Sequence, residues 1–193
     1  MPLRIAVVGP GRLGGALARR WHEAGLEVLG VLGRDPARCA EALAFIGAGR
    51  ALAPADLAHA AIVAVTVADA AIDEVAGMLA ARLRPCALVF HVAGSRGRDA
   101  LAPCAERGAR TAALHPLLPA PDREAAYAGL PGRFALLEAC ARGERLLALV
   151  ARRAGLVPWR AGGAIDRDAY HAGCALAANG ATALVGAAAA VLR

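Results

Sequence analysis

The feature that most constrains the fold is the segment 3–35, where an apolar run leads into a glycine turn, a helical pattern and a second apolar run. Glycine occupies positions 9, 11 and 14, directly after the first run. The apolar residues of the stretch that follows recur at helical spacing, at Leu13, Leu17 and Trp21. Strand, glycine turn, helix and strand in this order predict the βαβ unit that opens a parallel sheet.

The three glycines have the spacing of a turn that binds a dinucleotide. Gly9 lets the chain turn sharply out of the strand, Gly11 removes a Cβ where backbone approaches a pyrophosphate, and Gly14 allows close packing of the helix. The phosphates would lie at the helix N-terminus, among free N–H groups. A chance or purely structural turn is the alternative, because glycine makes up 22 of 193 residues. The flanking strand and helix favour binding, so we expect cofactor contacts from Gly9, Gly11, Arg12, Leu13 and Gly14.

The end of the second apolar run indicates which dinucleotide is bound. An NAD site usually places a carboxylate there for the ribose 2′-hydroxyl, whereas the 2′-phosphate of NADP needs a cation. The sequence reads Gly33-Arg34-Asp35, with Arg38 one helical turn later. Asp35 is best explained as the N-cap of a helix that begins at Pro36, although a shift of one residue would make it the ribose carboxylate. We therefore expect NADP, with Arg34 on the 2′-phosphate.

Beyond this unit, strand-like and helix-like segments keep alternating, which is typical of an α/β fold with a doubly wound, mostly parallel Rossmann sheet. The expected strands are 50–52, 61–66, 86–91, 111–114, 133–138 and 156–160. The expected helices are 36–45, 69–83, a stretch ending at 107, and 141–154, with a proline-rich loop from 116 to 131.

The pattern changes near the C-terminus. Residues 166–193 predict one long helix with an aspartate at its start and no strand after it. We place a domain boundary at the Ala-Gly-Gly stretch 161–163. Residues 1–161 then form the expected NADP-binding Rossmann domain, and residues 162–193 form the first long helix of a helical, dimerising domain.

Composition argues against several other classes of protein. The five cysteines are scattered, and no pair has the spacing of a zinc site or a disulfide framework. The net charge is +6, but the arginines are dispersed and aromatic residues make up 4%, so no nucleic-acid surface is expected. The alanine-rich stretch after Asn179 is too short and small-sided for a convincing membrane span, and the N-terminus lacks a leader pattern. We expect a cytoplasmic protein that binds no membrane.

Few side chains in this chain can take part in chemistry. All 22 basic residues are arginine, so no lysine can act as a proton donor. His91 and His115 each end an expected strand, at the sheet edge where ligands lie, and could donate the proton that completes a hydride transfer. Hydrogen bonds from these rings to backbone at the strand ends are the alternative.

Four further polar residues are candidates for the site. Thr66 ends a strand at the ligand edge, and Ser95 could hold the nicotinamide or a substrate, or simply cap the next helix. His171 and Asn179 lie eight residues apart and can border one face of the last helix, about 12 Å apart along its axis. We expect that face to close over the cofactor crevice.

Several segments together resemble a family of Rossmann-like oxidoreductases with a C-terminal helical domain of unknown function (domain of unknown function 2520), relatives of pyrroline-5-carboxylate reductase and of the phosphogluconate dehydrogenase-like superfamily. The segments are GPGRLGGALA, GRD, HVAGS, ALHPL, RFALLEA and DRDAYHAGCALAAN. The resemblance implies an NADP-binding domain, a helical domain that usually dimerises, and a reductase-like site between them. Family members generally continue well beyond the long helix, whereas this sequence stops at Arg193.

The residues and the resemblance together predict an NADP(H)-dependent oxidoreductase. Hydride would pass to a small carbonyl or imine substrate, with His91, His115, His171 or Asn179 at the reacting atoms. The superfamily's hydroxyacid dehydrogenases use a lysine that this chain lacks, which favours a carbonyl or imine reductase. A non-catalytic module that senses NADP is the alternative, and in either case we expect a homodimer formed through the last helix.

Overall fold

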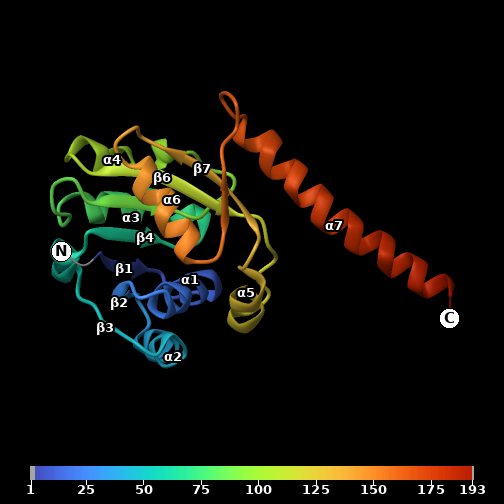
Figure 1. The fold of residues 1–193 in the computed structure, drawn as a ribbon, viewed down its shortest axis with the longest axis horizontal. Helices are drawn as coiled ribbons and strands as arrows, with labels where there is room; N and C mark the ends of the chain where they lie inside the picture. The colour runs from blue at the N-terminus through green and yellow to red at the C-terminus, as the bar shows by residue number, and fades with distance from the viewer. Residues whose placement is uncertain (1–2, 193) are drawn as a thin grey trace.

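An eight-stranded sheet forms the centre of residues 3–192, the part of the chain that this computed structural model describes (Figure 1). The strands lie in the order β3-β2-β1-β4-β5-β6-β7-β8. Their bounds are β1 (Arg4–Val8), β2 (Glu27–Leu32), β3 (Arg50–Ala51), β4 (Ile62–Val65), β5 (Leu88–His91), β6 (Arg110–Pro116), β7 (Phe134–Ala139) and β8 (Val157–Trp159). β1 to β6 are parallel, β7 is antiparallel to β6, and β8 is parallel to β7. The mostly parallel α/β fold predicted from the sequence is confirmed.

Helices cover both faces of the sheet and make three layers (Figure 1). One face packs against α1 (Arg12–Glu23), α2 (Pro36–Ile46), α5 (Arg123–Gly129) and α6 (Glu144–Arg153). The other face packs against α3 (Ile72–Ala80), α4 (Ala102–Glu106) and the 3₁₀ turns η1 (Pro54–His59) and η3 (Arg98–Leu101). In β1, Ile5 and Val7 join the first core while Ala6 and Val8 join the second, because successive strand side chains point to opposite faces. A sheet buried on both faces explains the continuous apolar runs in the sequence.

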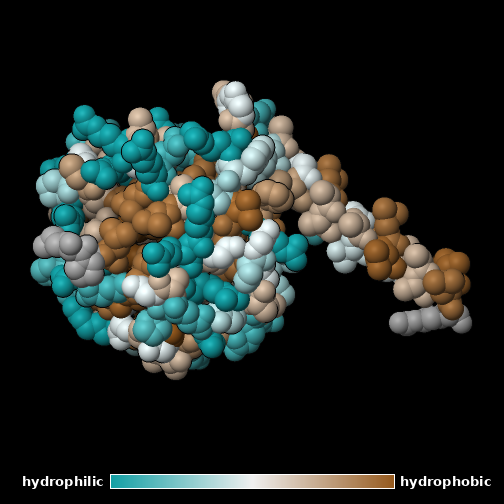
Figure 2. All heavy atoms as spheres, viewed as in Figure 1, coloured by the Kyte–Doolittle hydropathy of each residue, from teal (hydrophilic) through white to brown (hydrophobic). Residues whose placement is uncertain are grey.

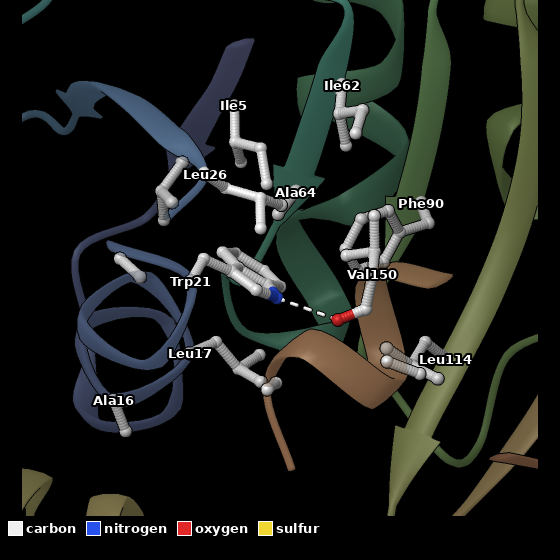
Figure 3. Close-up of a cluster of buried hydrophobic side chains, with 14 of the residues drawn as sticks. Ile5, Ala16, Leu17, Trp21, Leu26, Ile62, Ala64, Phe90, Leu114 and Val150 are labelled. Carbon is white, nitrogen blue, oxygen red and sulfur yellow. Dashed lines mark hydrogen bonds between the residues drawn. The ribbon is translucent and has the colours of Figure 1, made fainter. Parts of the chain in front are cut away.

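The larger core is organised around Trp21 on α1 (Figure 3). Its side chain is fully buried, and the indole N–H donates to the backbone carbonyl of Val150 on α6 at 2.9 Å. The ring meets Phe90 of β5 edge to face, with centroids 6.1 Å apart. One side chain therefore joins two helices to the middle of the sheet and leaves no buried polar atom of its own unpaired.

Helix α5 lies within the segment expected as a proline-rich loop, so that expectation is wrong for residues 123–129. Asp122 begins the helix by accepting a hydrogen bond from a backbone N–H of the first turn at 2.7 Å. Tyr127 then packs on α1, with the guanidinium carbons of Arg19 and Arg20 at 4.5 and 3.9 Å from its ring centroid. A helix of seven residues is too short to show a recognisable apolar period in the sequence. Its stability comes from contacts with α1 rather than from its own length.

Helix α7 (Arg167–Val191) is a single long helix, as predicted from the sequence, and it projects from the body as a rod (Figures 1 and 2). Asp166 caps it, accepting two backbone N–H bonds at 3.0 Å. None of its described residues is buried, and Leu176, Leu184 and Val185 are 74, 74 and 70% exposed. By length and composition alone this helix could cross a membrane. The sequence analysis considered only the stretch after Asn179, which is too short for a span, whereas the helix begins at Arg167.

The two tryptophans of the chain offer a matched test of the core. Trp21→Ala should lower the free energy of unfolding by about 3 to 5 kcal/mol, because it empties a fully buried site. Trp159→Ala should cost far less, since that side chain is 46% exposed on the edge strand. Urea denaturation measures both, and equal losses would contradict this description of the core.

Candidate functional site

The glycine turn lies against the end of β4. Gly9 has a φ of +92°, and its N–H donates to the Leu32 carbonyl at 2.8 Å. The Thr66 hydroxyl, directly after β4, donates to the Gly9 carbonyl at 2.6 Å. A Cβ on Gly14 would collide with that hydroxyl and lie 2.7 Å from the Gly9 carbonyl oxygen. Gly14 is therefore required for packing against Thr66 and the turn itself, rather than against the body of β1.

Gly11 differs from its two neighbours because the space beside it is open. The nearest protein atom to a Cβ placed there would be the Thr66 carbonyl oxygen, at 3.9 Å. Gly11 is the N-cap of α1, no side chain caps that helix, and its first turn holds no acidic residue. The helix start therefore offers backbone N–H groups and the positive end of its dipole to an anion, with room for the anion to approach.

A cavity of about 740 Å³ begins at this turn. It lies past the carboxyl ends of β1 and β4, where the strand order reverses and open α/β sheets bind ligands. Four of the predicted cofactor residues line it, namely Gly9, Gly11, Arg34 and Thr66. The described lining also includes apolar side chains, namely Leu52, Pro54, Val67, Val75 and Met78. Arg12, Leu13 and Gly14 follow the turn without lining the cavity, and Ser95 lies outside it.

Two arginines stand at the end of β2, beside this cavity. Arg34 and Arg38 both line it and both are exposed. Asp35 between them accepts hydrogen bonds from the backbone N–H groups of Ala37 at 2.9 Å and Arg38 at 3.3 Å. The prediction that Asp35 is the N-cap of α2 is confirmed. One oxygen of its carboxylate is thereby committed to the start of the helix.

A second polar cluster lies past the ends of β5 and β6, at the first turn of α7. His115 Nδ1 is 3.0 Å from the Tyr170 hydroxyl, and the two rings meet edge to face at 5.6 Å. The His171 ring centroid is 6.4 Å from that of His115. Gly94 supports the arrangement, because a Cβ there would lie 2.6 Å from the His115 ring. The structure thus brings together two of the three predicted histidines.

The ring of His91 is hydrogen-bonded to backbone, which was the alternative to a catalytic role for histidines at strand ends. It is fully buried, its Nδ1 accepts from the Ala93 N–H at 3.3 Å, and its Nε2 is 2.8 Å from the Gly97 carbonyl oxygen. Because Nδ1 accepts, Nε2 carries the hydrogen and donates to Gly97. Burial lowers the pKa of His91. This ring therefore shapes the turn after β5, and backbone occupies both of its nitrogens.

Two other candidates, Ser95 and Asn179, are not hydrogen-bonded to the cluster's histidines in the described part of the chain. The Ser95 hydroxyl donates to the carboxylate of Asp69, in the 3₁₀ turn η2 (Asp69–Ala71), and does not cap the next helix. Asn179 is exposed on α7, and this helix leads away from the body rather than closing over the cavity (Figure 1). The expected closure fails because α7 contacts the body of its own chain through its first turns.

Sequence reasoning missed three residues of the cluster: Arg167, Tyr170 and Glu138. Arg167 donates to the Glu138 carboxylate, its side chain is 12% exposed, and its Nη1 is buried with no hydrogen-bond partner among the described residues. Arg167 and Tyr170 belong to the DRDAYHAG segment, so that segment gave the signal. Glu138 gave no signal in the sequence, because it lies near the end of an otherwise ordinary strand.

The surroundings of His115 keep its ring neutral. Burial is the main cause that lowers the pKa of His115, to about 4, and electrostatic interactions with His171 and Arg167 act in the same direction. The carboxylate of Asp69 opposes them without reversing the shift. At neutral pH, His115 thus holds a single ring proton and cannot act as an imidazolium acid.

This shift predicts a loss of stability on acidification. The unfolded chain protonates His115 near the ordinary pKa of about 6.5, whereas the folded protein does so near 4. Between these values the unfolded state binds more protons, so the His115 contribution is complete above pH 6.5 and is lost as the pH falls. His115→Asn should reduce the decrease in unfolding free energy between pH 7 and 5 by roughly 1 to 3 kcal/mol. Urea titrations at both pH values measure it, and identical pH dependence in both proteins would contradict the assignment.

Comparisons with known proteins agree with this geometry. A family model described as a Rossmann-like domain matches residues 1–116. No curated protein matches the chain in sequence. Among solved structures, a protein assigned as an NADP oxidoreductase from Bacteroides fragilis is 18% identical, with a TM-score of 0.80 over 99% of this chain and 72% of that one.

Two further solved structures are similar. A semialdehyde dehydrogenase NAD-binding protein from Cupriavidus necator, solved with NAD and calcium, is 18% identical, with a TM-score of 0.71 over 100% of this chain and 75% of that one. A 3-hydroxyisobutyrate dehydrogenase from Mycobacterium tuberculosis is 19% identical, with a TM-score of 0.67 over 83% of this chain and 55% of that one. The chain therefore spans little more than half the length of the dehydrogenase. At these identities the likeness extends to the fold.

Proposed function

The chain belongs to the Rossmann-like domain family, and from this premise we propose that it is an NADP(H)-dependent oxidoreductase. The observation that carries the proposal is the cavity past β1 and β4, which opens at the glycine turn and leaves space beside Gly11. A dinucleotide would set its pyrophosphate at the start of α1 and its adenosine half against the apolar lining of the cavity. The names of the similar structures, which include an NADP oxidoreductase and two dehydrogenase-related proteins, support the same class.

The choice of NADP over NAD is supported by the end of β2. Arg34 and Arg38 border the cavity where a ribose 2′-substituent would lie, and guanidinium groups suit a phosphate. Asp35, the residue that could have held a 2′-hydroxyl, is engaged as a helix cap. Its carboxylate also lies 3.7 Å from the Arg38 guanidinium, but both side chains are largely exposed and the pair holds Arg38 only weakly.

The reaction that we propose is hydride transfer to a small carbonyl or imine, for which a bound NADPH would supply the hydride. The dinucleotide would run from the cavity along the sheet edge, from β4 towards β5 and β6. The cluster of His115, Tyr170 and His171 lies at that end and would supply the proton. We also propose kinship with the domain of unknown function 2520 proteins and pyrroline-5-carboxylate reductase, on the segments that carry the resemblance. A cytoplasmic location stays a prediction.

Substitution of Arg34 tests the cofactor assignment. Arg34→Asp should weaken NADPH binding by at least tenfold and change NADH affinity little, because only NADPH places a phosphate beside this residue. Arg84→Asp is the matched control, since it makes the same charge change in the loop that precedes β5, at the opposite sheet edge. Fluorescence titration measures both nucleotides. An unchanged preference for NADPH over NADH in Arg34→Asp would contradict the assignment to NADP. Binding of NADPH without any turnover of carbonyls or imines would favour the alternative, a non-catalytic module that senses NADP.

We further propose that the protein is a homodimer through α7, whose exposed leucines and valines lack a partner among residues 3–192. Analytical ultracentrifugation should give twice the chain mass of 19.5 kDa. Leu184→Arg combined with Val185→Arg should dissociate the dimer. The two substitutions would place charges where the dimer would bury apolar side chains. A monomer in buffer, or a wild-type protein recovered only with membranes, would contradict this proposal.

A further inference from the structure

Resting on the proposed function, we propose that Tyr170 is the catalytic residue that donates the proton completing the reduction, and that His115 is its positioning residue. The juxtaposition that carries this inference is a phenol on the first turn of α7 held against an imidazole at the end of β6. The two residues are 55 positions apart in the chain, and their polar atoms are 3.0 Å apart.

The placement of the pair suits the chemistry. His115 stands at the carboxyl end of β6, on the same sheet edge as the glycine turn and Thr66. Tyr170 is half-buried, so part of its side chain remains accessible. A substrate placed beside the nicotinamide end of the dinucleotide would therefore be able to reach the phenol.

His91 and His115 are less suitable proton donors in this setting. His91 has both nitrogens occupied by backbone groups. His115 is neutral at neutral pH, and giving up its only ring proton would leave an imidazolate. Burial, in contrast, raises the pKa of the Tyr170 hydroxyl, so the phenol keeps its proton until a strong base forms beside it. An alkoxide generated by hydride addition is such a base.

Two nearby groups would offset part of the cost of burying the phenolate left after transfer. His115 Nδ1 can donate to the phenolate oxygen, because the ring is neutral and its orientation is fixed over Gly94. Arg167 lies three residues before Tyr170 on α7 and its positive charge favours the phenolate, opposing the larger effect of burial. Glu138 holds that guanidinium in place. These are fixed groups aimed at the atom where charge develops, as electrostatic catalysis requires.

Hydride from NADPH adds to the carbonyl carbon, and the electron pair of the carbonyl π bond moves onto oxygen. That oxygen forms an O–H bond with the Tyr170 proton as the phenol O–H bond breaks, which gives the alcohol, NADP⁺ and a phenolate. The phenolate accepts the Nδ1–H hydrogen bond and then takes a proton from solvent on its accessible side. For an imine, nitrogen replaces oxygen and the product is an amine.

The experiment begins with NADPH binding, which tests the proposed function separately. Wild type and Tyr170→Phe should bind NADPH with the same affinity and unfold at the same temperature. In a screen of small aldehydes, ketones and cyclic imines, Tyr170→Phe should lower kcat by about 100- to 10,000-fold on any compound that the wild type reduces. Tyr127→Phe is the control, because Tyr127 is the only other tyrosine and binds Glu23 on α1, away from the cluster.

Two further readouts test the role of His115. His115→Phe should lower kcat in the wild-type background but cost nothing more in Tyr170→Phe, because both substitutions act on one proton transfer. His115→Asn, which keeps an N–H donor, should retain more activity than His115→Phe. Between about pH 5.5 and 8, kcat should stay level, whereas it would fall with rising pH if a histidine were the acid. The titratable and charged groups around His115 are Asp69, His91, Arg167, Tyr170 and His171.

Each outcome supports or overturns the inference. Full activity in Tyr170→Phe, additive losses in the double variant, or a kcat that falls through neutral pH would overturn it and leave the proposed function standing. A wild type that binds NADPH but reduces no compound in the screen would overturn both the oxidoreductase proposal and this one. A wild type that does not bind NADPH would overturn the cofactor assignment itself.

Discussion

The approach of the glycine turn to Thr66 is the contact on which the rest of the structure depends. The Thr66 hydroxyl binds the Gly9 carbonyl, and Gly14 leaves just enough room for that hydroxyl between helix and strand. This contact ties β1, α1 and β4 together at the point where the strand order reverses. It also sets the direction of α1, so that the open space beside Gly11 lies at the mouth of the cavity. The packing and the proposed ligand site therefore have a common origin.

Two sites of different character follow from this arrangement. The cavity at β1, β2 and β4 is built largely from backbone, exposed arginines and an apolar wall, which suits a phosphate-bearing nucleotide. The cluster at β5, β6 and α7 includes two partly buried groups, His115 and Tyr170, whose pKa values are displaced from their ordinary ranges. Displaced pKa values of this kind concentrate where proton transfer takes place. A reductase needs both kinds of site along one sheet edge.

The sequence predicted the first site better than the second for a physical reason. Turn chemistry is local, so the glycine spacing, the Asp35 cap and the position of Arg34 could be read within 35 residues. The second site depends on contacts between distant segments, and nothing near His115 in sequence announces Tyr170 or Glu138. His91 shows the same limit, because its strand-end position is compatible with chemistry or with backbone hydrogen bonds, and only the fold distinguishes them. Helix α5 was missed since its stability comes from stacking on α1.

The most direct test of the central claim is a crystal structure of the protein with NADPH. The pyrophosphate should lie beside Gly11 at the start of α1, the 2′-phosphate against Arg34, and the nicotinamide ring should point along the sheet edge towards Tyr170. A nucleotide bound elsewhere, or a cavity that stays empty at saturating NADPH, would contradict it.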